Sequence, residues 1–186
     1  EGQFGGGIYF IRTGIAKIEV NGKNGRPLIL RLAGPGSIFG HRIRGNSDEQ
    51  PLTVVAVEDL YVCHVSIFLY DQLVKKSPEL HNGMMNALLS EMRQVELHAV
   101  RLTHLSVKER VAGALLHVAD LYQYQPASNG IRVHLERQDL ADLSGTTREQ
   151  VSRMLAELQL AGFIKFRGKH FKFLDLDALQ HIATLH

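Results

Sequence analysis

The stretch from Glu136 to Leu174 constrains the fold more than any other part of the chain, because it specifies several elements in a fixed order. ERQDLADLSG predicts a short helix that ends at Gly145, and TTREQVSRMLAELQLAG predicts a longer helix that ends at Gly162. FIKFRGKHFKFL, with Gly168-Lys169 at its centre, predicts a β-hairpin. A short helix, a glycine-containing turn, a second helix and a basic hairpin are together typical of a winged helix-turn-helix.

The second of these helices carries the residue types that read DNA. Val151, Leu155 and Leu158 predict its buried side, while polar residues gather at its N-terminal end, the part of a recognition helix that enters the major groove. Arginine can donate two hydrogen bonds to guanine, and glutamate can accept one from cytosine. Threonine hydroxyls can cap the helix or bind phosphate, and the cations of the hairpin suit a phosphate backbone. The predicted DNA-contact residues are Gln138, Thr146, Thr147, Arg148, Glu149, Ser152, Arg153, Lys165, Arg167 and Lys169, with Lys172 nearby in the hairpin.

The N-terminal third of the chain has the pattern of an all-β domain. Short strands are expected at 8–14, 16–20, 27–33, 53–60 and 61–67. Asn24-Gly25 is the residue pair that tight hairpin turns favour. Many short strands with glycine-rich connections indicate an antiparallel barrel or jelly roll. Because the chain starts almost inside the first strand, we expect further strands of this domain to precede Glu1.

Between these regions, apolar residues recur at alternating intervals of three and four. This heptad spacing predicts one long helix that starts near Ser77 and Pro78 and pairs with the same helix of a second copy. A helix packed on its own barrel is the alternative. The predicted dimer residues are Met85, Leu88, Met92, Val95, Ala99 and Leu102.

In this order of elements, the chain resembles the CRP/FNR family of bacterial transcription regulators over 8–185. The resemblance is strongest in RQDLADLSGTTREQVSRMLAELQLAGFI. The residues that match the R-E-x-x-S/G-R pattern of the family's recognition helix are Arg148, Glu149, Ser152 and Arg153. Serine in the third place is similar to the FNR branch, whose half-sites centre on a TTGA-like sequence. The resemblance implies a cytoplasmic homodimer that binds a two-fold symmetric operator, with half-sites about 34 Å apart, and that contacts RNA polymerase.

The same resemblance implies an α+β fold and a division into three parts. These are a sensory, cyclic-nucleotide-binding-like β-barrel (jelly roll) at 1–76, a dimerisation helix at 77–104, and a C-terminal winged helix-turn-helix domain at 105–186. A capping box at 106–109 is expected to start the first helix of the last part. An unidentified signal received at the barrel is then expected to control DNA binding.

The stretch GSIFGHRIRG at 36–45 stands where this family holds its ligand. In cyclic-nucleotide-binding members, F-G-E-L/I supplies a glutamate for the ribose hydroxyl, and a later R-S/T-A supplies an arginine for the cyclic phosphate. Here His41 replaces the glutamate, and EQPLT at 49–53 has no arginine, so cyclic AMP is not expected. Another anion, or a turn that only closes the barrel, are the remaining alternatives. The candidate effector residues are Gly40, His41, Arg42 and Arg44.

Composition excludes several other classes of protein. The single cysteine, Cys63, allows no internal disulfide, fits a reducing cytoplasm and is interpreted as a small core residue. One thiol is too few for an iron–sulfur cluster, which needs about four. A cluster bound by cysteines before Glu1, or a haem, are the alternatives that remain, so the cofactor is unknown. The ten histidines show no metal-binding spacing.

No membrane span or catalytic motif is visible in the sequence. A span needs about 18 consecutive apolar residues, and nucleophile-elbow, P-loop and zinc-protease motifs are absent, which argues against an enzyme. The alternative to a DNA-binding regulator is a ligand-binding or scaffold module that uses the helix-turn-helix for protein contacts.

Overall fold

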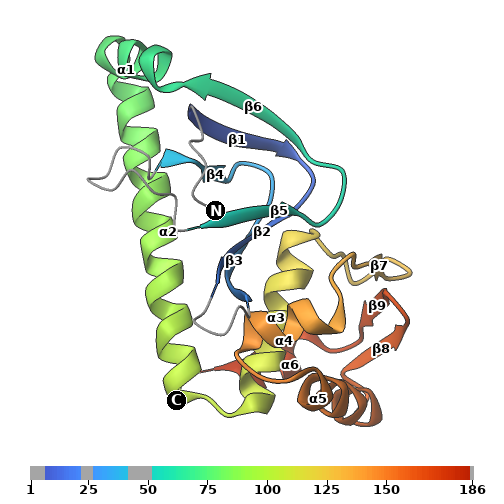
Figure 1. Ribbon diagram of the computed structural model, residues 1–186. Helices are drawn as coiled ribbons and strands as arrows, with labels where there is room; N and C mark the ends of the chain where they lie inside the picture. Colours follow the sequence, from blue (N-terminus) through green and yellow to red (C-terminus); the bar gives the residue numbers. More distant parts are fainter. Residues whose placement is uncertain (1–6, 22–26, 42–51, 185–186) are drawn as a thin grey trace. The chain divides into compact units, whose positions relative to one another are not determined.

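The computed structural model describes residues 7–21, 27–41 and 52–184, and the chain divides into two compact units (Figure 1). Unit 1 comprises 1–97 and unit 2 comprises 98–186. The α+β class predicted from the sequence describes both units. The three-part division at 76/77 and 104/105 stays a prediction.

The first sheet of unit 1 is antiparallel and has three strands. β1 (Gly7–Thr13) lies in the middle, between β4 (Ile38–Phe39) and β6 (Tyr61–Ser66). The register pairs Gly7 with Ser66 and shifts between Ile11 and Thr13, where the strand bulges. The two-residue strand β4 was not predicted, because so short a strand has no period of its own.

The second sheet of unit 1 is also antiparallel. β2 (Ala16–Asn21) is its central strand, between β3 (Pro27–Ala33) and β5 (Thr53–Ala56). Among the described residues the strands thus form two separate sheets and not one closed barrel. The predicted Asn24-Gly25 turn lies outside the described residues, but antiparallel pairing of β2 with β3 agrees with a hairpin.

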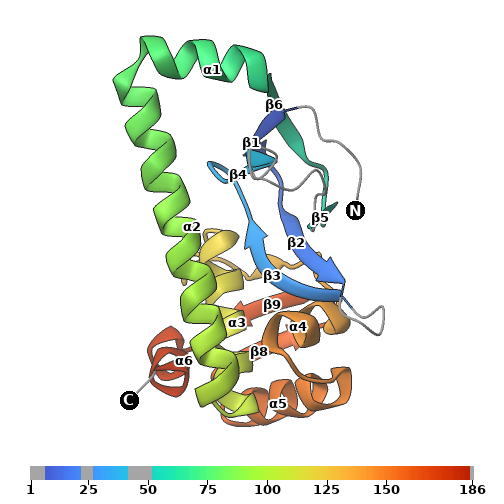
Figure 2. The ribbon, with the colours of Figure 1, turned by 60° about the vertical axis from the view of Figure 1, so that its left-hand side comes forward.

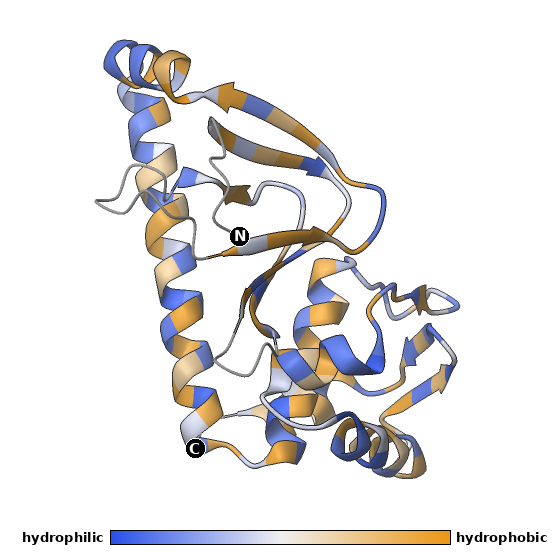
Figure 3. Cartoon of the chain, viewed as in Figure 1, coloured by the Kyte–Doolittle hydropathy of each residue, from blue (hydrophilic) through white to orange (hydrophobic). Residues whose placement is uncertain are grey.

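Two helices follow the sheets of unit 1. α1 (Ile67–Lys76) was not predicted: Ser66 caps it by accepting a hydrogen bond from the backbone N–H of Leu69 at 3.3 Å. α2 (Pro78–His104) covers the span predicted as one long helix. Its buried Met84 packs with Ile8, Ile38 and Tyr70, so this part of the helix covers the β4–β1–β6 sheet. Apolar and polar residues alternate in patches along its length (Figure 3).

Unit 2 is built on α3 (Val107–Leu121). The predicted capping box is present: the backbone N–H of Ser106 donates to the Glu109 carboxylate at 2.6 Å, and the Ser106 hydroxyl accepts from the Glu109 N–H at 3.4 Å. α4 (Arg137–Ser144) and α5 (Arg148–Leu160) are the predicted helix pair. Both pack against α3.

The remaining elements of unit 2 are the third sheet and the last helix. The sheet order is β7 (Ile131–Arg132), β9 (His170–Phe173) and β8 (Ile164–Arg167). The β8–β9 hairpin turns at Gly168-Lys169 as predicted, and β8 packs on α5 (Figure 2). α6 (Leu176–Ala183), which packs on α3, was not predicted.

Candidate nucleic-acid interface

The helix α5 presents a buried face to unit 2 and an exposed face to solvent. Val151, Leu155 and Leu158 are fully buried, as predicted. The side chains predicted to read bases are all exposed: Arg148, Glu149, Ser152 and Arg153. The polar end of α5 is therefore free of packing and accessible to a large ligand.

The turn before α5 fixes where that helix starts. Gly145 has φ 57°, in the left-handed region that favours glycine, and a Cβ atom there would lie 2.5 Å from Cδ2 of Leu102. The Thr147 hydroxyl accepts from the backbone N–H of Gln150 at 3.3 Å and caps the helix. Thr146 hydrogen-bonds the Gln150 side chain. Thr147 thus caps the helix as predicted, whereas Thr146 contacts the helix through the Gln150 side chain.

Glu149 is held in its charged form at this helix start. Its pKa lies below the usual range, first because the carboxylate accepts from its own backbone N–H, then because of the Thr147 hydroxyl, and finally because of the charge of Arg148. The Ser152 hydroxyl donates to the Arg148 carbonyl at 2.9 Å. A charged carboxylate between arginines can accept a hydrogen bond from a base amine while the arginines donate to other acceptors.

The β8–β9 hairpin carries a cluster of cations. Lys165 lies directly opposite Lys172 in the register, so two like charges share one face of the hairpin. Arg167 and Lys169 are exposed at the turn; the Lys169 ammonium donates to the His134 carbonyl at 3.3 Å and lies 3.7 Å from the Glu136 carboxylate. Like charges directly opposite one another are destabilising unless an anion offsets them.

Gln138 is the one predicted contact residue on α4. Its side chain is exposed, and its amide donates to the Asp142 carboxylate at 2.7 Å. The amide is therefore oriented along the helix surface.

Sequence reasoning missed Arg137, the neighbour of Gln138. Its guanidinium lies over the rings of Phe166 and Phe171, at 4.9 and 5.2 Å from their centroids. Burial lowers its pKa, and the nearby charge of Arg148 lowers it further, but a guanidinium stays protonated in proteins. Arg137 thus joins α4 to the hairpin and adds positive charge beside α5. No local pattern indicates this, because the partner rings are distant in sequence.

Arg110 of α3 was also missed, and it holds the turn between α4 and α5. Its guanidinium donates to the carbonyls of Leu105 at 2.6 Å, Ser144 at 2.7 Å and Gly145 at 3.3 Å. These carbonyls lie at helix ends, where backbone acceptors lack helical partners. Arg110 therefore ties the start of α3 to the end of α4, where the turn toward α5 begins.

The candidate effector residues are only partly described. Arg42 and Arg44 lie outside the described residues. Gly40 has φ 86°, and a Cβ atom there would lie 2.5 Å from the Gly7 carbonyl oxygen, so β1 already accounts for this glycine. His41 lies with its Nε2 atom 3.6 Å from Oε2 of Glu91, on α2. The structure thus brings His41 to a carboxylate of its own chain.

The predicted dimer residues of α2 have mixed surroundings. Met85 and Met92 are 45% and 55% exposed. Leu88 packs at the edge of the Ile8–Met84 cluster of unit 1. The other large apolar side chains exposed on this helix are Leu89, Leu97 and Val100. An exposed apolar stripe on α2 suits a partner helix, but the exact seam stays a prediction.

The interpretation of Cys63 as a core residue is wrong. Cys63 is exposed in β6, as are its neighbours Val62 and His64. In the described part of the chain no group of His, Cys, Asp and Glu side chains is placed to hold a metal ion. Among these residues, no helical stretch combines the length and the hydrophobicity that a membrane span requires.

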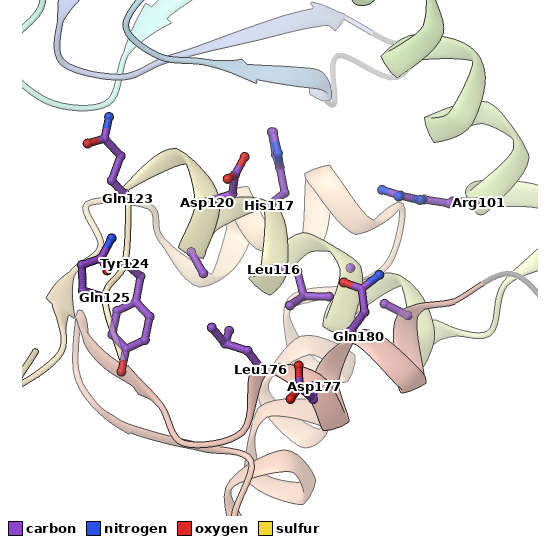
Figure 4. A pocket seen from close by; sticks show the side chains of 13 residues that line it. Arg101, Leu116, His117, Asp120, Gln123, Tyr124, Gln125, Leu176, Asp177 and Gln180 are labelled. Carbon is purple, nitrogen blue, oxygen red and sulfur yellow. The ribbon is translucent and has the colours of Figure 1, made fainter. Parts of the chain in front are cut away.

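Unit 2 also contains a cavity of about 780 Å³ between α3 and α6 (Figure 4). Arg101, His117, Asp120 and Gln180 are among the residues that line it. Burial lowers the pKa of His117; Asp120 opposes this shift and Arg101 adds to it. Burial also lowers the pKa of the nearby His98. None of the predicted DNA-contact residues lines this cavity.

Comparison with known proteins decides the family. Residues 1–77 match the model of the cyclic nucleotide-binding domain, and residues 109–182 match the Crp-like helix-turn-helix domain. The chain belongs to the CRP/FNR family of transcription regulators. The resemblance that the recognition-helix residues indicated is thereby confirmed.

Two curated relatives are a regulatory protein and a receptor protein by name. The chain is 27% identical over 177 residues to the anaerobic regulatory protein of Pasteurella multocida. This alignment covers 95% of this chain and 64% of that protein. It is 28% identical over 183 residues to the cyclic AMP receptor protein of Thermus thermophilus, which covers 98% of this chain and 82% of that one. The chain thus spans less than two thirds of the first relative. None of these similarities supports the scaffold alternative.

Solved structures show the same fold. FixK2 from Bradyrhizobium japonicum superimposes with a TM-score of 0.86 at 23% identity and covers 100% of this chain and 91% of its own. TTHB099 from Thermus thermophilus, described as a CRP-family transcriptional regulator, gives a TM-score of 0.83 at 24% identity and covers 98% and 90%. The predicted fold class is confirmed, although the described strands do not close into a barrel.

Proposed function

We propose that this CRP/FNR regulator binds a two-fold symmetric DNA site as a homodimer and reads each half-site with the N-terminal end of α5. The observation that carries the proposal is the exposure of Arg148, Glu149, Ser152 and Arg153 on a helix whose opposite face is fully buried. These residue types match the donor and acceptor pattern of base edges in the major groove.

The residues around α5 supply the rest of the proposed interface. Thr146 and Thr147 present hydroxyls near the helix start, where backbone N–H groups also attract phosphate. Lys165, Arg167 and Lys169 offer charge from the hairpin to the phosphate backbone. Gln138 and Arg137 extend this surface on α4.

The proposed dimer joins two copies through α2. The candidate interface residues are Met85, Leu88, Met92, Val95, Ala99 and Leu102. In this dimer two recognition helices reach successive major grooves about 34 Å apart. The regulator is proposed to act in the cytoplasm, to contact RNA polymerase and to have no catalytic activity of its own. A signal received at unit 1 is proposed to control DNA binding, with Gly40, His41, Arg42 and Arg44 as the candidate effector residues.

Fluorescence anisotropy with two duplexes tests the proposal. One duplex carries inverted TTGA half-sites one helical turn apart, and the other carries the same bases in scrambled order. At about 150 mM salt, we expect the palindrome to bind about a thousandfold more tightly or better, as is usual for specific over non-specific binding. The matched control for variants that lose a cation of the proposed interface is Lys76→Ala, which removes an exposed lysine at the end of α1. Equal affinity for both duplexes would contradict sequence-specific reading.

A further inference from the structure

A buried ion pair joins a strand of unit 1 to the long helix. The side chain of Arg31, on β3, is 9% exposed, and that of Glu91, on α2, is 12% exposed. Nε and a terminal nitrogen of Arg31 both reach Oε1 of Glu91, at 3.2 and 3.1 Å. The same terminal nitrogen donates to the Ile38 carbonyl of β4 at 2.9 Å. One guanidinium on β3 thus contacts both a strand of the other sheet and a helix that is distant in sequence.

The second oxygen of Glu91 faces the candidate effector stretch. It is buried and accepts no hydrogen bond from the described residues, and it lies 3.6 Å from Nε2 of His41. The His41 side chain is 16% exposed. The carboxylate of Glu91 therefore lies between Arg31 on one side and the imidazole of His41 on the other.

Because these charged side chains are largely shielded from water, each needs a partner of opposite charge. A buried guanidinium is expensive to leave without an anion, so Arg31 needs a negative partner in the folded protein. Glu91, on α2, supplies such a partner from the same chain. Because Glu91 contacts Arg31 and lies against His41, the cluster ties β3, β4 and α2 together next to Gly40-His41.

We propose that Glu91 is a built-in anionic ligand of unit 1. Its carboxylate supplies the negative charge between Arg31 and His41, so that α2 is held on the sheets without a bound effector. A signal would then act by weakening this cluster and not by filling an empty anion site. The inference deepens the proposed function, and it rests on that function only for its effect on DNA binding.

Hydrogen exchange of the full chain, without added ligand, tests the inference directly. The readout is the peptide that covers Met84 to Glu91. Glu91→Gln keeps the shape of the side chain and removes its charge, and we expect exchange in this peptide to rise about tenfold or more. Glu96→Gln, which removes an exposed carboxylate from the same helix, is the matched control and is expected to leave exchange unchanged.

A charge swap separates a specific contact from general damage. Arg31→Glu and Glu91→Arg should each speed exchange, whereas the double variant should recover at least part of the protection, because the pair is restored in reverse. If Glu91→Gln exchanges like Glu96→Gln, or if the double variant is no better than the single ones, the inference is wrong.

Added anions provide the second arm. Cyclic AMP and inorganic phosphate, each added to the wild type, should leave exchange of the Met84 to Glu91 peptide and the affinity for the palindromic duplex unchanged. Protection by either anion comparable to the effect of Glu91→Gln would overturn the inference. If the wild type binds no duplex specifically but the exchange results hold, the DNA-binding proposal fails while the built-in ligand stands.

Discussion

Arg31 in unit 1 and the two arginines of α5 in unit 2 have opposite surroundings. In unit 1, Arg31 is 8% exposed and its guanidinium is bonded to a carboxylate and a carbonyl. In unit 2, Arg148 and Arg153 are exposed, and within the part of the chain that the structure describes neither forms a salt bridge. A charge whose partner is built in stabilises the fold, while a charge without a partner is available to a ligand. Among the described arginines, this difference supports the proposal that Arg148 and Arg153 of unit 2 bind an anionic ligand.

The comparison breaks if the charge of Arg31 is dispensable for folding. Replacing Arg31 by Ala leaves the Glu91 carboxylate buried without its partner, which should lower the free energy of unfolding by about 3–5 kcal/mol. Urea unfolding followed by circular dichroism measures this. Arg153→Ala is the control and should change stability by no more than about 0.5 kcal/mol. Similar values for the two variants would show that burial of Arg31 has no energetic consequence.

For DNA affinity, unlike for stability, Arg153 is expected to be important. Arg153→Ala should weaken binding to the palindrome by about 1–3 kcal/mol and relax the preference at one base pair, since a bidentate contact with guanine would be lost. Anisotropy with duplexes that vary one base at a time gives both quantities. A loss of equal size on every duplex would assign Arg153 to phosphate contact instead.

The cations of the hairpin should contribute to DNA affinity through salt-dependent contacts with phosphate, which do not depend on base sequence. Lys165→Ala should weaken binding to all duplexes alike and reduce the slope of log K against log salt concentration by about 1. Titrations at several salt concentrations measure the slope. An unchanged slope would mean that Lys165 makes no phosphate contact.

The smallest expected effect concerns two half-buried histidines of unit 2, His98 and His117. Burial lowers the pKa of His117 below 6.5, the value for an exposed histidine, although Asp120 opposes the shift. The unfolded chain then binds the proton more readily than the folded one. The free energy of unfolding is therefore highest above pH 6.5 and decreases as the pH falls from that value through the lower pKa of the folded state.

Urea unfolding at about pH 7.5 and about pH 5.5 measures this loss. His117→Gln should reduce the difference between the two pH values, because the glutamine does not titrate. His98, whose pKa burial also lowers, should retain part of it. A variant with the same pH dependence as the wild type would exclude His117 as its source.

Elements specified by neighbouring residues were predicted well. The capping box at Ser106, the turn at Gly145 and the buried side of α5 depend on residues within a few positions of each other. The two-residue β4 was missed because it has no pattern. α1 was missed because its first apolar residues directly follow the strand residues of β6, and only the Ser66 cap marks the change. α6 had a usable signal in the Asp175 cap, which accepts from the Ala178 N–H at 2.8 Å.

The candidate site divides in the same way. The exposed residues of α5 follow from helical periodicity, but the contacts of Arg137 with Phe166 and of Arg31 with Glu91 join distant segments. No local pattern fixes such pairs. Cys63 was misjudged because the apolar character of a strand does not tell whether another element covers it.

The two facing lysines of the hairpin have a consequence for how dissolved ions affect this protein. Lys165 and Lys172 repel each other in the free chain, and added salt screens that repulsion over a Debye length of about 8 Å at physiological ionic strength. The same ions compete with the hairpin for phosphate. Raising the ionic strength should therefore stabilise the hairpin in the free protein and weaken its complex with DNA. The free and the bound states thus respond to salt in opposite directions.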